Sequence, residues 1–356
     1  MKIAVLLSGG VDSSVALALL KEQGHDITAF YIKIWLEDEL SFLGQCPWEE
    51  DLQYAQFVCD AFQVPLKIIP LQREYYNRVV HYALEELKKG RTPSPDIFCN
   101  KRIKFGAFFD KIDESFEKVA SGHYACLEEK NNIVYLKNSP DPIKDQTYFL
   151  AHLSQKQLQR LLFPIGKFHK DEVRQLAEQY NLANKNRKDS QGICFLGKIK
   201  YKDFVKHHLG EKTGLILEQG TNRKLGTHNG YWYYTIGQRQ GLGLSGGPWY
   251  VIEKDLKNNI IYVSLSYNKE QYARNQYIVS NFNWLADWQD PTGEVRIKIR
   301  HGPQFFHGNL TMLPQENPDE PQKGEVTLQE TDTGIAPGQF SVFYKDDICL
   351  GCAEIC

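Results

Sequence analysis

The segment Ser8-Gly9-Gly10-Val11-Asp12-Ser13-Ser14 places two glycines, several serine hydroxyls and one carboxylate directly after an apolar run. Glycine lets the backbone approach a ligand closely, and the start of a following helix presents unpaired N–H groups and a positive dipole end. The segment therefore predicts a phosphate-binding turn. It is neither a Walker A loop, since no GK[ST] follows, nor a dinucleotide fingerprint, since G-x-G-x-x-G is absent. The alternative is an ordinary tight turn with a serine cap.

Two cysteines, Cys99 and Cys194, occupy contexts that favour a reactive thiol. Pro93 and Pro95 stiffen the extended approach to Cys99, and glycines stand on both sides of Cys194. Basic residues surround both thiols: Lys101, Arg102 and Lys104 follow the first, and Lys188 and Lys198 flank the second. Neighbouring cations lower the pKa of a thiol and favour the thiolate, its reactive form. A buried, inert cysteine is the alternative at each position.

The chain has eight cysteines and no secretory signal, which predicts reduced thiols rather than a disulfide framework. The spacing of Cys349, Cys352 and Cys356 could hold a metal ion. These residues lie in an apolar strand pattern without a partner pair or a histidine cluster, so we expect them to be structural. Cys46 lies in an acidic insertion, where the thiolate is disfavoured.

Strand-like and helix-like segments alternate through the first third of the chain. Short apolar or β-branched runs predict strands at 3–7, 27–35, 66–69 and 118–122. Helical patterns lie at 15–23, 49–62 and 73–89, and Gly24 and Gly90 end the first and the last of them. Strands separated by helices in this way predict a parallel, doubly wound α/β sheet.

Beyond about Tyr201 the pattern changes to short β-rich pieces separated by Gly, Asn and Asp. We expect strands at 230–236, 249–252, 260–265, 293–300, 325–329 and 340–344. Closely spaced strands of this kind form antiparallel sheets or small barrels. The proline-rich stretch 314–324 is expected to be a long loop. The aromatic run 231–234 near Arg239 fits a strand core, with base stacking as the alternative.

Length and composition bound the class of protein. A chain of 356 residues predicts two or three domains, and 42% hydrophobic with 24% charged residues is an ordinary globular composition. Neither a signal peptide nor an apolar run of about 20 residues is present, so we expect a cytoplasmic protein with no membrane partner. The formal net charge of −2 excludes a uniformly basic nucleic-acid-binding protein.

Charge is nevertheless unevenly distributed along the chain. Residues 181–206 carry seven basic side chains against two acidic ones, whereas residues 34–66 carry seven acidic side chains and no basic one. A charge run is most often a solvated surface. The basic segment, which contains Cys194, would supply a groove for a nucleic acid.

Motifs along nearly the whole chain resemble known families. The phosphate-binding turn resembles the loop of the ATP pyrophosphatase family, whose members adenylate an oxygen and release pyrophosphate. In order, the other motifs resemble the signatures of the MnmA family of tRNA-specific 2-thiouridylases: RTPSPDIFCNKRIKF (91–105), SGHYA (121–125), KDQTYFL (144–150), KDSQGICFLG (188–197), YTIGQRQGLGL (234–244), GPWYV (247–251) and APGQ (336–339).

The resemblance implies an enzyme that thiolates the wobble uridine of tRNA with ATP and magnesium. It implies an adenine nucleotide alpha hydrolase-like catalytic domain at 1–203, a β-rich domain at 204–272 and a tRNA-binding β-barrel at 273–356. After adenylation of O2, sulphur displaces AMP. Cys194 carries that sulphur as a persulfide from a cysteine desulfurase or a sulphur-relay protein, and Cys99 assists its release and ends in a disulfide with Cys194. Asp96 looks like the base-contacting acid and proton relay.

The same resemblance assigns binding residues. Contacts with ATP are implied at Leu6, Leu7, Ser8, Gly9, Gly10, Val11, Asp12, Ser13, Ile32 and Gly122. Contacts with tRNA are implied at Ser94, Pro95, Asp96, His123, Lys144, Asp145, Gln146, Lys298, Ile299 and Gln339. The family commonly has an Arg–aromatic pair where this chain has Lys298-Ile299, so a stacking contact is not expected there. For His123 the alternative is a histidine that satisfies local hydrogen bonds.

Two other functions fit parts of the pattern. An amidating synthetase of the same ATP-using class would need an ammonia source and no essential thiol. An RNA-binding protein that keeps an ATP-sensing fold would form no AMP in the presence of tRNA.

Overall fold

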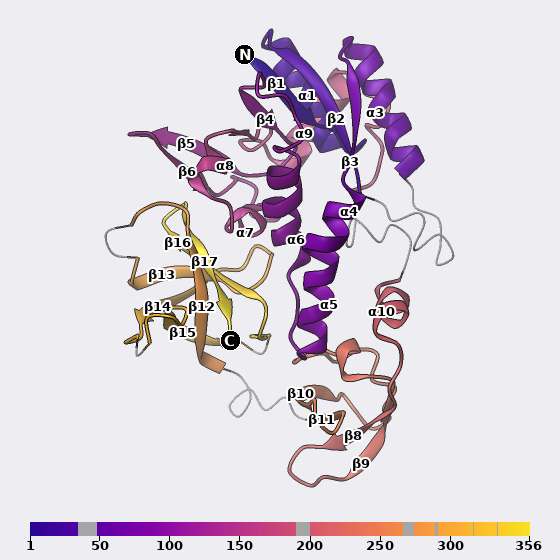
Figure 1. The fold of residues 1–356 in the computed structure, drawn as a ribbon, viewed down its shortest axis with the longest axis vertical. Coiled ribbons are helices and arrows are strands. Elements are labelled where there is room, and N and C mark those ends of the chain that lie inside the picture. The colour runs from indigo at the N-terminus through magenta and orange to yellow at the C-terminus, as the bar shows by residue number, and fades with distance from the viewer. Residues whose placement is uncertain (35–47, 190–199, 266–273, 289–290, 316, 333) are drawn as a thin grey trace.

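The computed structural model describes residues 1–356 except 35–47, 190–199, 266–273, 289–290, 316 and 333. Three bodies are visible in Figure 1. A parallel sheet with its helices forms the first, a small sheet at the opposite end of the long axis forms the second, and a C-terminal barrel lies beside the helices that descend from the first. The predicted fold class, α/β followed by all-β, is confirmed.

The N-terminal sheet has five parallel strands in the order β3-β2-β1-β4-β7. The strands are β1 (Lys2–Leu6), β2 (Asp26–Lys33), β3 (Leu66–Pro70), β4 (Lys118–Ala120) and β7 (Leu161–Leu162). Four of them match predicted strands. The sequence did not predict β7, because two residues are too few to show a hydrophobic period.

Strand β1 is buried on both faces, as its continuous apolar run predicts. Ile3 and Val5 enter the core shared with α1 (Val11–Glu22), α3 (Trp48–Phe62) and α9 (Lys170–Gln179). Ala4 and Leu6 enter the other core, together with residues of α4 (Gln72–Tyr75), η2 (Tyr76–Val80), α5 (His81–Lys88), α6 (Pro95–Phe98) and η3 (Cys99–Ala107). The sheet is therefore doubly wound.

The helix predicted at 73–89 is a composite. A π-helical section, η2, joins α4 to α5, and Gly90 follows with a φ of 71°. A positive φ is open to glycine without steric cost, so the predicted end of this helix is correct. Three further short helices are α7 (Thr147–Leu150), α8 (Gln155–Leu158) and α10 (Tyr201–Leu209). The boundary expected at 203/204 falls inside α10.

The C-terminal barrel is closed by six strands in the order β12-β15-β14-β13-β16-β17, with β17 pairing back to β12. They are β12 (Arg274–Trp284), β13 (Gly293–Lys298), β14 (Phe306–Met312), β15 (Lys323–Asp332), β16 (Phe340–Lys345) and β17 (Ile348–Ile355). A hairpin of the first body, β5 (Cys126–Lys130) and β6 (Ile133–Lys137), adds to the start of β17. Cys349 and Cys352 are fully buried in β17, which gives them a structural place.

The central sheet has four strands in the order β10-β11-β8-β9: β8 (Gly214–Glu218), β9 (Lys224–His228), β10 (Tyr250–Asp255) and β11 (Ile260–Ser264). The strand expected at 230–236 is wrong. Tyr231–Tyr233 form a 3-10 turn, η4. Gly230 has a φ of 138°, and the Trp232 ring lies against it, where an added Cβ would meet that ring at 2.5 Å. The turn therefore depends on this glycine.

Candidate active site

The predicted phosphate turn lies between β1 and α1, at the carboxyl edge of the sheet. Gly9 has a φ of 77°, and Gly10 caps the helix. The Gly10 carbonyl accepts hydrogen bonds of 3.0 Å from the hydroxyls of Ser13 and Ser14. These hydroxyls shape the turn. The first amides of α1, which have no intrahelical acceptor, are the groups that suit an anion.

Two glycines make this turn a close-packed cradle. A Cβ on Gly9 would lie 2.2 Å from the Asp51 carbonyl oxygen, and a Cβ on Gly122 would lie 2.6 Å from the Ser13 amide nitrogen. Gly122 follows β4, the strand next to β1, and Ile32 lies near the end of β2 on its other side. The residues predicted to contact ATP, Leu6 to Ser13 with Ile32 and Gly122, thus gather at one sheet edge, where open α/β sheets bind ligands. Their ATP contacts stay predictions.

Asp12 in this turn is held by two side chains that the sequence did not single out. Lys170 Nζ lies 2.7 Å from Asp12 Oδ1, and the Tyr124 hydroxyl donates to the same oxygen at 2.9 Å. Lys170 is the first residue of α9, and Tyr124 belongs to the SGHYA motif. The ammonium group of Lys170 therefore lies directly beside the predicted phosphate turn.

Asp189 gathers three cations beside this turn. Its carboxylate lies 2.6 Å from Lys144 Nζ, 2.8 Å from Lys170 Nζ and 2.7 Å from an Arg174 nitrogen. Burial alone would raise the pKa of Asp189, but the hydrogen bonds from Lys144 and Lys170 bring that pKa down to about 2. Lys144, predicted to contact tRNA, is thereby placed next to the phosphate turn.

Residues just before Asp189 fix the backbone of Gly9. The Asn184 amide donates to the Gly9 carbonyl at 2.8 Å and to the Ser14 hydroxyl at 2.9 Å. Arg187 donates to the same carbonyl at 3.2 Å and pairs with Asp51 of α3. Two other cations of the predicted basic groove also form ion pairs: Lys185 with Glu178, and Lys206 with Glu211.

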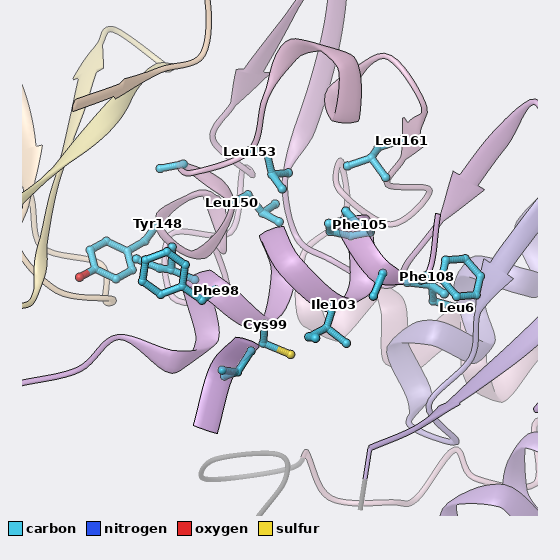
Figure 2. Close-up of a cluster of buried hydrophobic side chains, with 14 of the residues drawn as sticks. Leu6, Phe98, Cys99, Ile103, Phe105, Phe108, Tyr148, Leu150, Leu153 and Leu161 are labelled. Atoms are coloured by element: carbon cyan, nitrogen blue, oxygen red, sulfur yellow. The ribbon is translucent and has the colours of Figure 1, made fainter. Parts of the chain in front are cut away.

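Cys99 is the first residue of η3 and is 2% exposed. Figure 2 shows Cys99 and Ile103 on one side of this helix and Leu150 and Leu153 on the other, with Leu6 of β1 near its far end. The same buried cluster contains Cys99 and Leu6. Cys99 is thus built into the same core as the strand that leads to the phosphate turn, and thiol exchange at its sulphur requires its cover to open. Cys194 and Cys46 lie outside the described residues.

The charge of Lys104 acts on both Asp96 and His123. Burial raises the pKa of Asp96, and the charges of Lys104 and His301 act against that rise. Burial and the Lys104 charge lower the pKa of His123 well below its usual range. His123 is 8% exposed, and its Nδ1 lies 2.8 Å from the Ser121 hydroxyl. His123 thus forms a local hydrogen bond, as expected if its role is structural. A tRNA contact by His123 stays a prediction.

Two predicted tRNA-contacting motifs touch each other although they are far apart in the sequence. The Thr92 amide donates to the Pro337 carbonyl at 2.8 Å, and the Ser94 hydroxyl donates to the Gly338 carbonyl at 3.5 Å. A Cβ on Gly338 would lie 2.8 Å from the Thr92 carbonyl oxygen. The structure therefore brings Ser94, Pro95 and Asp96 of the first body to Gln339 of the barrel.

Asp145, Lys298 and Ile299, also predicted to contact tRNA, are buried in this conformation. Lys298 and Asp145 form an ion pair of 2.7 Å, with side chains 0% and 2% exposed. Ile299 lies in the barrel core. Gln146 bonds to the backbone of Tyr124. The tRNA contacts of these four residues stay predictions. For Lys298 and Asp145 to contact tRNA, their buried ion pair would have to open.

The sequence missed several residues of the site. Lys170, Arg174 and Asp141 lie outside the motifs that guided the predictions, and Asp189 lies inside KDSQGICFLG without an assigned role. Only the capping box of His169 and Glu172 at the start of α9 marks the place of Lys170 in the sequence. Long-range ion pairs leave no local pattern, because their partners are set by the fold.

Within the described ranges, no three His, Cys, Asp or Glu side chains come close enough together to hold a metal ion. None of the described helices has the length and apolar character that a membrane crossing requires.

The fold and the turn define a HUP-type α/β domain with two appended β domains. Three family models match in order: a tRNA methyl transferase HUP domain at 1–198, a tRNA methyl transferase PRC-barrel domain at 202–265 and an aminomethyltransferase beta-barrel domain at 274–355. Curated relatives share the whole length of the chain. The tRNA-specific 2-thiouridylase MnmA of Parabacteroides distasonis is 46% identical over 100% of this chain and 99% of its own. MnmA 2 of Bacteroides fragilis is 47% identical over 100% of both.

The chain belongs to the tRNA-specific 2-thiouridylase MnmA family. The family models carry methyl transferase names, whereas these full-length relatives are named thiouridylases. Two solved structures are more distant. A 4-thiouridine synthetase in complex with RNA and ATP is 16% identical over 59% of this chain and 50% of that one, with a TM-score of 0.34. NMN synthetase of Francisella tularensis is 15% identical over 59% and 77%, with a TM-score of 0.33. Scores this low carry no argument about function.

Proposed function

We propose that the chain is a tRNA-uridine 2-sulfurtransferase that uses ATP to replace O2 of the wobble uridine with sulphur. The observation that carries this proposal is the full-length similarity to thiouridylases in a chain that also forms a phosphate-type turn at the carboxyl edge of its sheet. The same similarity makes tRNA the partner.

The first half-reaction would take place at the turn. The first amides of α1 would bind the phosphates, and Lys170 and Lys144 would supply positive charge beside them. Asp12 is the carboxylate of the turn that would face a magnesium ion bound with ATP. Uridine O2 attacks the α-phosphorus and pyrophosphate leaves, so O2 becomes part of a good leaving group.

The second half-reaction uses two thiols. The terminal sulphur of a persulfide on Cys194 attacks C2, and AMP departs with the former O2. The Cys99 thiolate then attacks the Cys194 sulphur, which frees the thiocarbonyl and leaves a Cys99–Cys194 disulfide. In the alternative order, Cys99 first expels sulfide from the persulfide, and the sulfide attacks C2. Both orders consume one persulfide and require an external reductant for the next turnover.

Asp96 would serve as the proton relay to the base. Burial raises the pKa of this carboxyl, and a raised pKa suits a group that must both hold and release a proton. Asp96 lies in the first turn of α6, ahead of Cys99, on the side where Ser94 meets the barrel. The base-contacting acid would therefore lie in α6, and the assisting thiol would follow it as the first residue of η3.

The test is a reconstituted reaction of protein, ATP, magnesium, a persulfide donor and unmodified tRNA, with the digested nucleosides weighed by mass spectrometry. We expect 2-thiouridine from the wild type and from the control Cys356→Ser, whose cysteine is exposed at the chain end. We expect at least about a hundredfold less from Cys194→Ser and Cys99→Ser, because a lost covalent role is not replaced by binding. Full activity of Cys194→Ser would exclude a sulphur relay and favour an amidating synthetase. Absence of AMP with cognate tRNA would favour the RNA-binding alternative.

A further inference from the structure

The segment 138–147 follows β6 and ends at the first residue of α7, and it is termed the strut below. It contains the consecutive residues Lys144, Asp145 and Gln146, and each of the three contacts a different part of the molecule. Lys144 contacts Asp189, Asp145 contacts the barrel, and Gln146 contacts the SGHYA motif. One short segment therefore connects the barrel with the surroundings of the phosphate turn.

At its barrel end the strut is held by a buried charge. Lys298 of β13 lies 2.7 Å from Asp145 Oδ2, and its ammonium stands 4.4 Å from the centre of the Phe305 ring. The Asp145 carboxylate also accepts the Ser139 amide at 3.1 Å and the Thr147 hydroxyl at 2.8 Å. Removing either charge leaves the other buried and uncompensated. Lys298 thereby fixes the conformation of the strut.

At its other end the strut meets the phosphate turn through Tyr124. The side-chain oxygen Oε1 of Gln146 accepts a hydrogen bond from the Tyr124 backbone N–H. The backbone N–H of Gln146 donates to the Tyr124 carbonyl, and both distances are 2.9 Å. The Tyr124 hydroxyl donates to Asp12 at 2.9 Å. These two hydrogen bonds set the position of Tyr124, and Tyr124 sets the position of the Asp12 carboxylate.

A second route runs through Asp141, whose carboxylate binds two segments at once. Asp141 Oδ1 accepts the Lys144 amide and Oδ2 accepts the Lys170 amide, each at 3.0 Å. Burial would raise the pKa of Asp141, but these backbone hydrogen bonds lower it below the usual range. One carboxylate of the strut thus fixes the starting points of both lysine side chains that reach Asp189.

We propose that Lys298 is a positioning residue for the phosphate turn: through Asp145 it holds the strut in the conformation that orients Lys144, Tyr124 and Asp12. The proposal deepens the function proposed above, on which it depends only for the identity of ATP as ligand. Lys298 itself reaches none of the turn residues, so it acts through the strut. Binding of ATP then requires the barrel to be seated on the first body.

The test uses the full-length protein and amide hydrogen exchange read by mass spectrometry without ligand. Lys298→Met removes the charge and keeps the length of the side chain, and Lys345→Met is the matched control on an exposed position of β16. We expect exchange in peptides covering 8–14 and 121–125 to rise about threefold or more in Lys298→Met and to stay at the wild-type rate in Lys345→Met. Faster exchange confined to 138–147 and the barrel would overturn the proposal.

A second measurement is the dissociation constant for ATP by calorimetry. We expect Lys298→Met to raise this constant about tenfold and Lys345→Met to leave it unchanged, because misplaced cations lose most of their attraction. An unchanged constant for Lys298→Met would overturn the proposal. A wild type that does not bind ATP would contradict the proposed function, while the exchange experiment would still decide the role of Lys298.

Should Lys298→Met fail to fold, the double variant Asp145→Asn with Lys298→Met leaves no charge buried without a partner. We expect this variant to fold and to show the faster exchange at 8–14, because the ion pair that locks the strut is absent. Wild-type exchange at 8–14 in the folded double variant would overturn the proposal.

Discussion

Lys101, two residues after Cys99 in the chain, forms a half-buried contact with His152. Lys101 Nζ lies 2.6 Å from His152 Nδ1, and the Phe98 and Phe340 rings lie beside the imidazole. Burial, aided by the charge of Lys101, lowers the pKa of His152 to about 4. A neutral imidazole that accepts a hydrogen bond from a lysine therefore belongs to the folded state.

This pair makes a residue-scale prediction about pH. An unfolded histidine has a pKa of about 6.5, so between there and about 4 the unfolded state binds more protons and the wild type loses stability as pH falls. We expect the free energy of unfolding of wild type minus that of His152→Gln to shrink by about 3 kcal/mol from pH 7 to pH 4. Urea unfolding across this range measures it. His81→Gln, at an exposed position of α5, is the control, and an equal pH trend in both variants would contradict the prediction.

At this scale the sequence predicted residue types better than partners. The glycines, serines and carboxylate of the turn were identified because their spacing is local. Lys170 and Asp189 were not assigned, since an ion pair between residues 12 and 170 has no sequence period. The tRNA contact of Lys298 stays a prediction, and only the structure shows that this lysine is fully buried and paired with Asp145.

At the scale of elements, the contact between 91–94 and 336–339 depends on one glycine. Gly338 has a φ of 90°, and an added Cβ would lie 2.8 Å from the Thr92 carbonyl oxygen and 3.0 Å from Arg91 Cβ. Gly293 has a similar φ of 88° with no atom within 4 Å of that position. An alanine at Gly293 would therefore add backbone strain alone, whereas an alanine at Gly338 would add both backbone strain and steric overlap.

We expect Gly293→Ala to lower the free energy of unfolding by about 1–2 kcal/mol, the cost of a left-handed conformation. Gly338→Ala should cost a further 1–3 kcal/mol or so, because its Cβ must push the 91–94 segment away from the barrel. Urea denaturation of both variants measures the difference. Equal losses would show that the two segments separate without cost.

Elements were predicted well where their hydrophobic period is long and poorly where it is short. Strands β1 to β4 and helix α3 match the expected positions, whereas β7 and the hairpin β5–β6 were missed. Strand β6 alternates buried and half-buried residues over only five positions. Its pairing with β17 comes from a segment more than two hundred residues away, which no local pattern encodes.

For the whole molecule, the distribution of cores predicts how the protein unfolds. One buried cluster joins Leu136, Tyr148 and Leu150 of the first body with Phe340 and Cys352 of the barrel. The central sheet has a cluster of its own, confined to residues 216–263. Elements that share a core unfold together, whereas a self-contained core can open alone.

We therefore expect hydrogen exchange in increasing urea to expose the peptides of β8 to β11 first. Peptides of the β5–β6 hairpin and of β17 should then exchange together at a higher urea concentration, in one cooperative step. Mass spectrometry of the digested protein follows each peptide separately. Different urea midpoints for the hairpin and for β17 would contradict a shared core.

The sequence by itself determined the class of the fold, the phosphate-type turn and the family, because each depends on local spacing or on the order of motifs. Only the tertiary structure decided how Lys144, Asp145 and Gln146 divide among three partners and how Cys99 is covered. Neighbouring residues of an irregular segment can point in different directions, and burial depends on what the rest of the chain places above them. Those quantities belong to the packing of distant segments, which the folded molecule alone specifies.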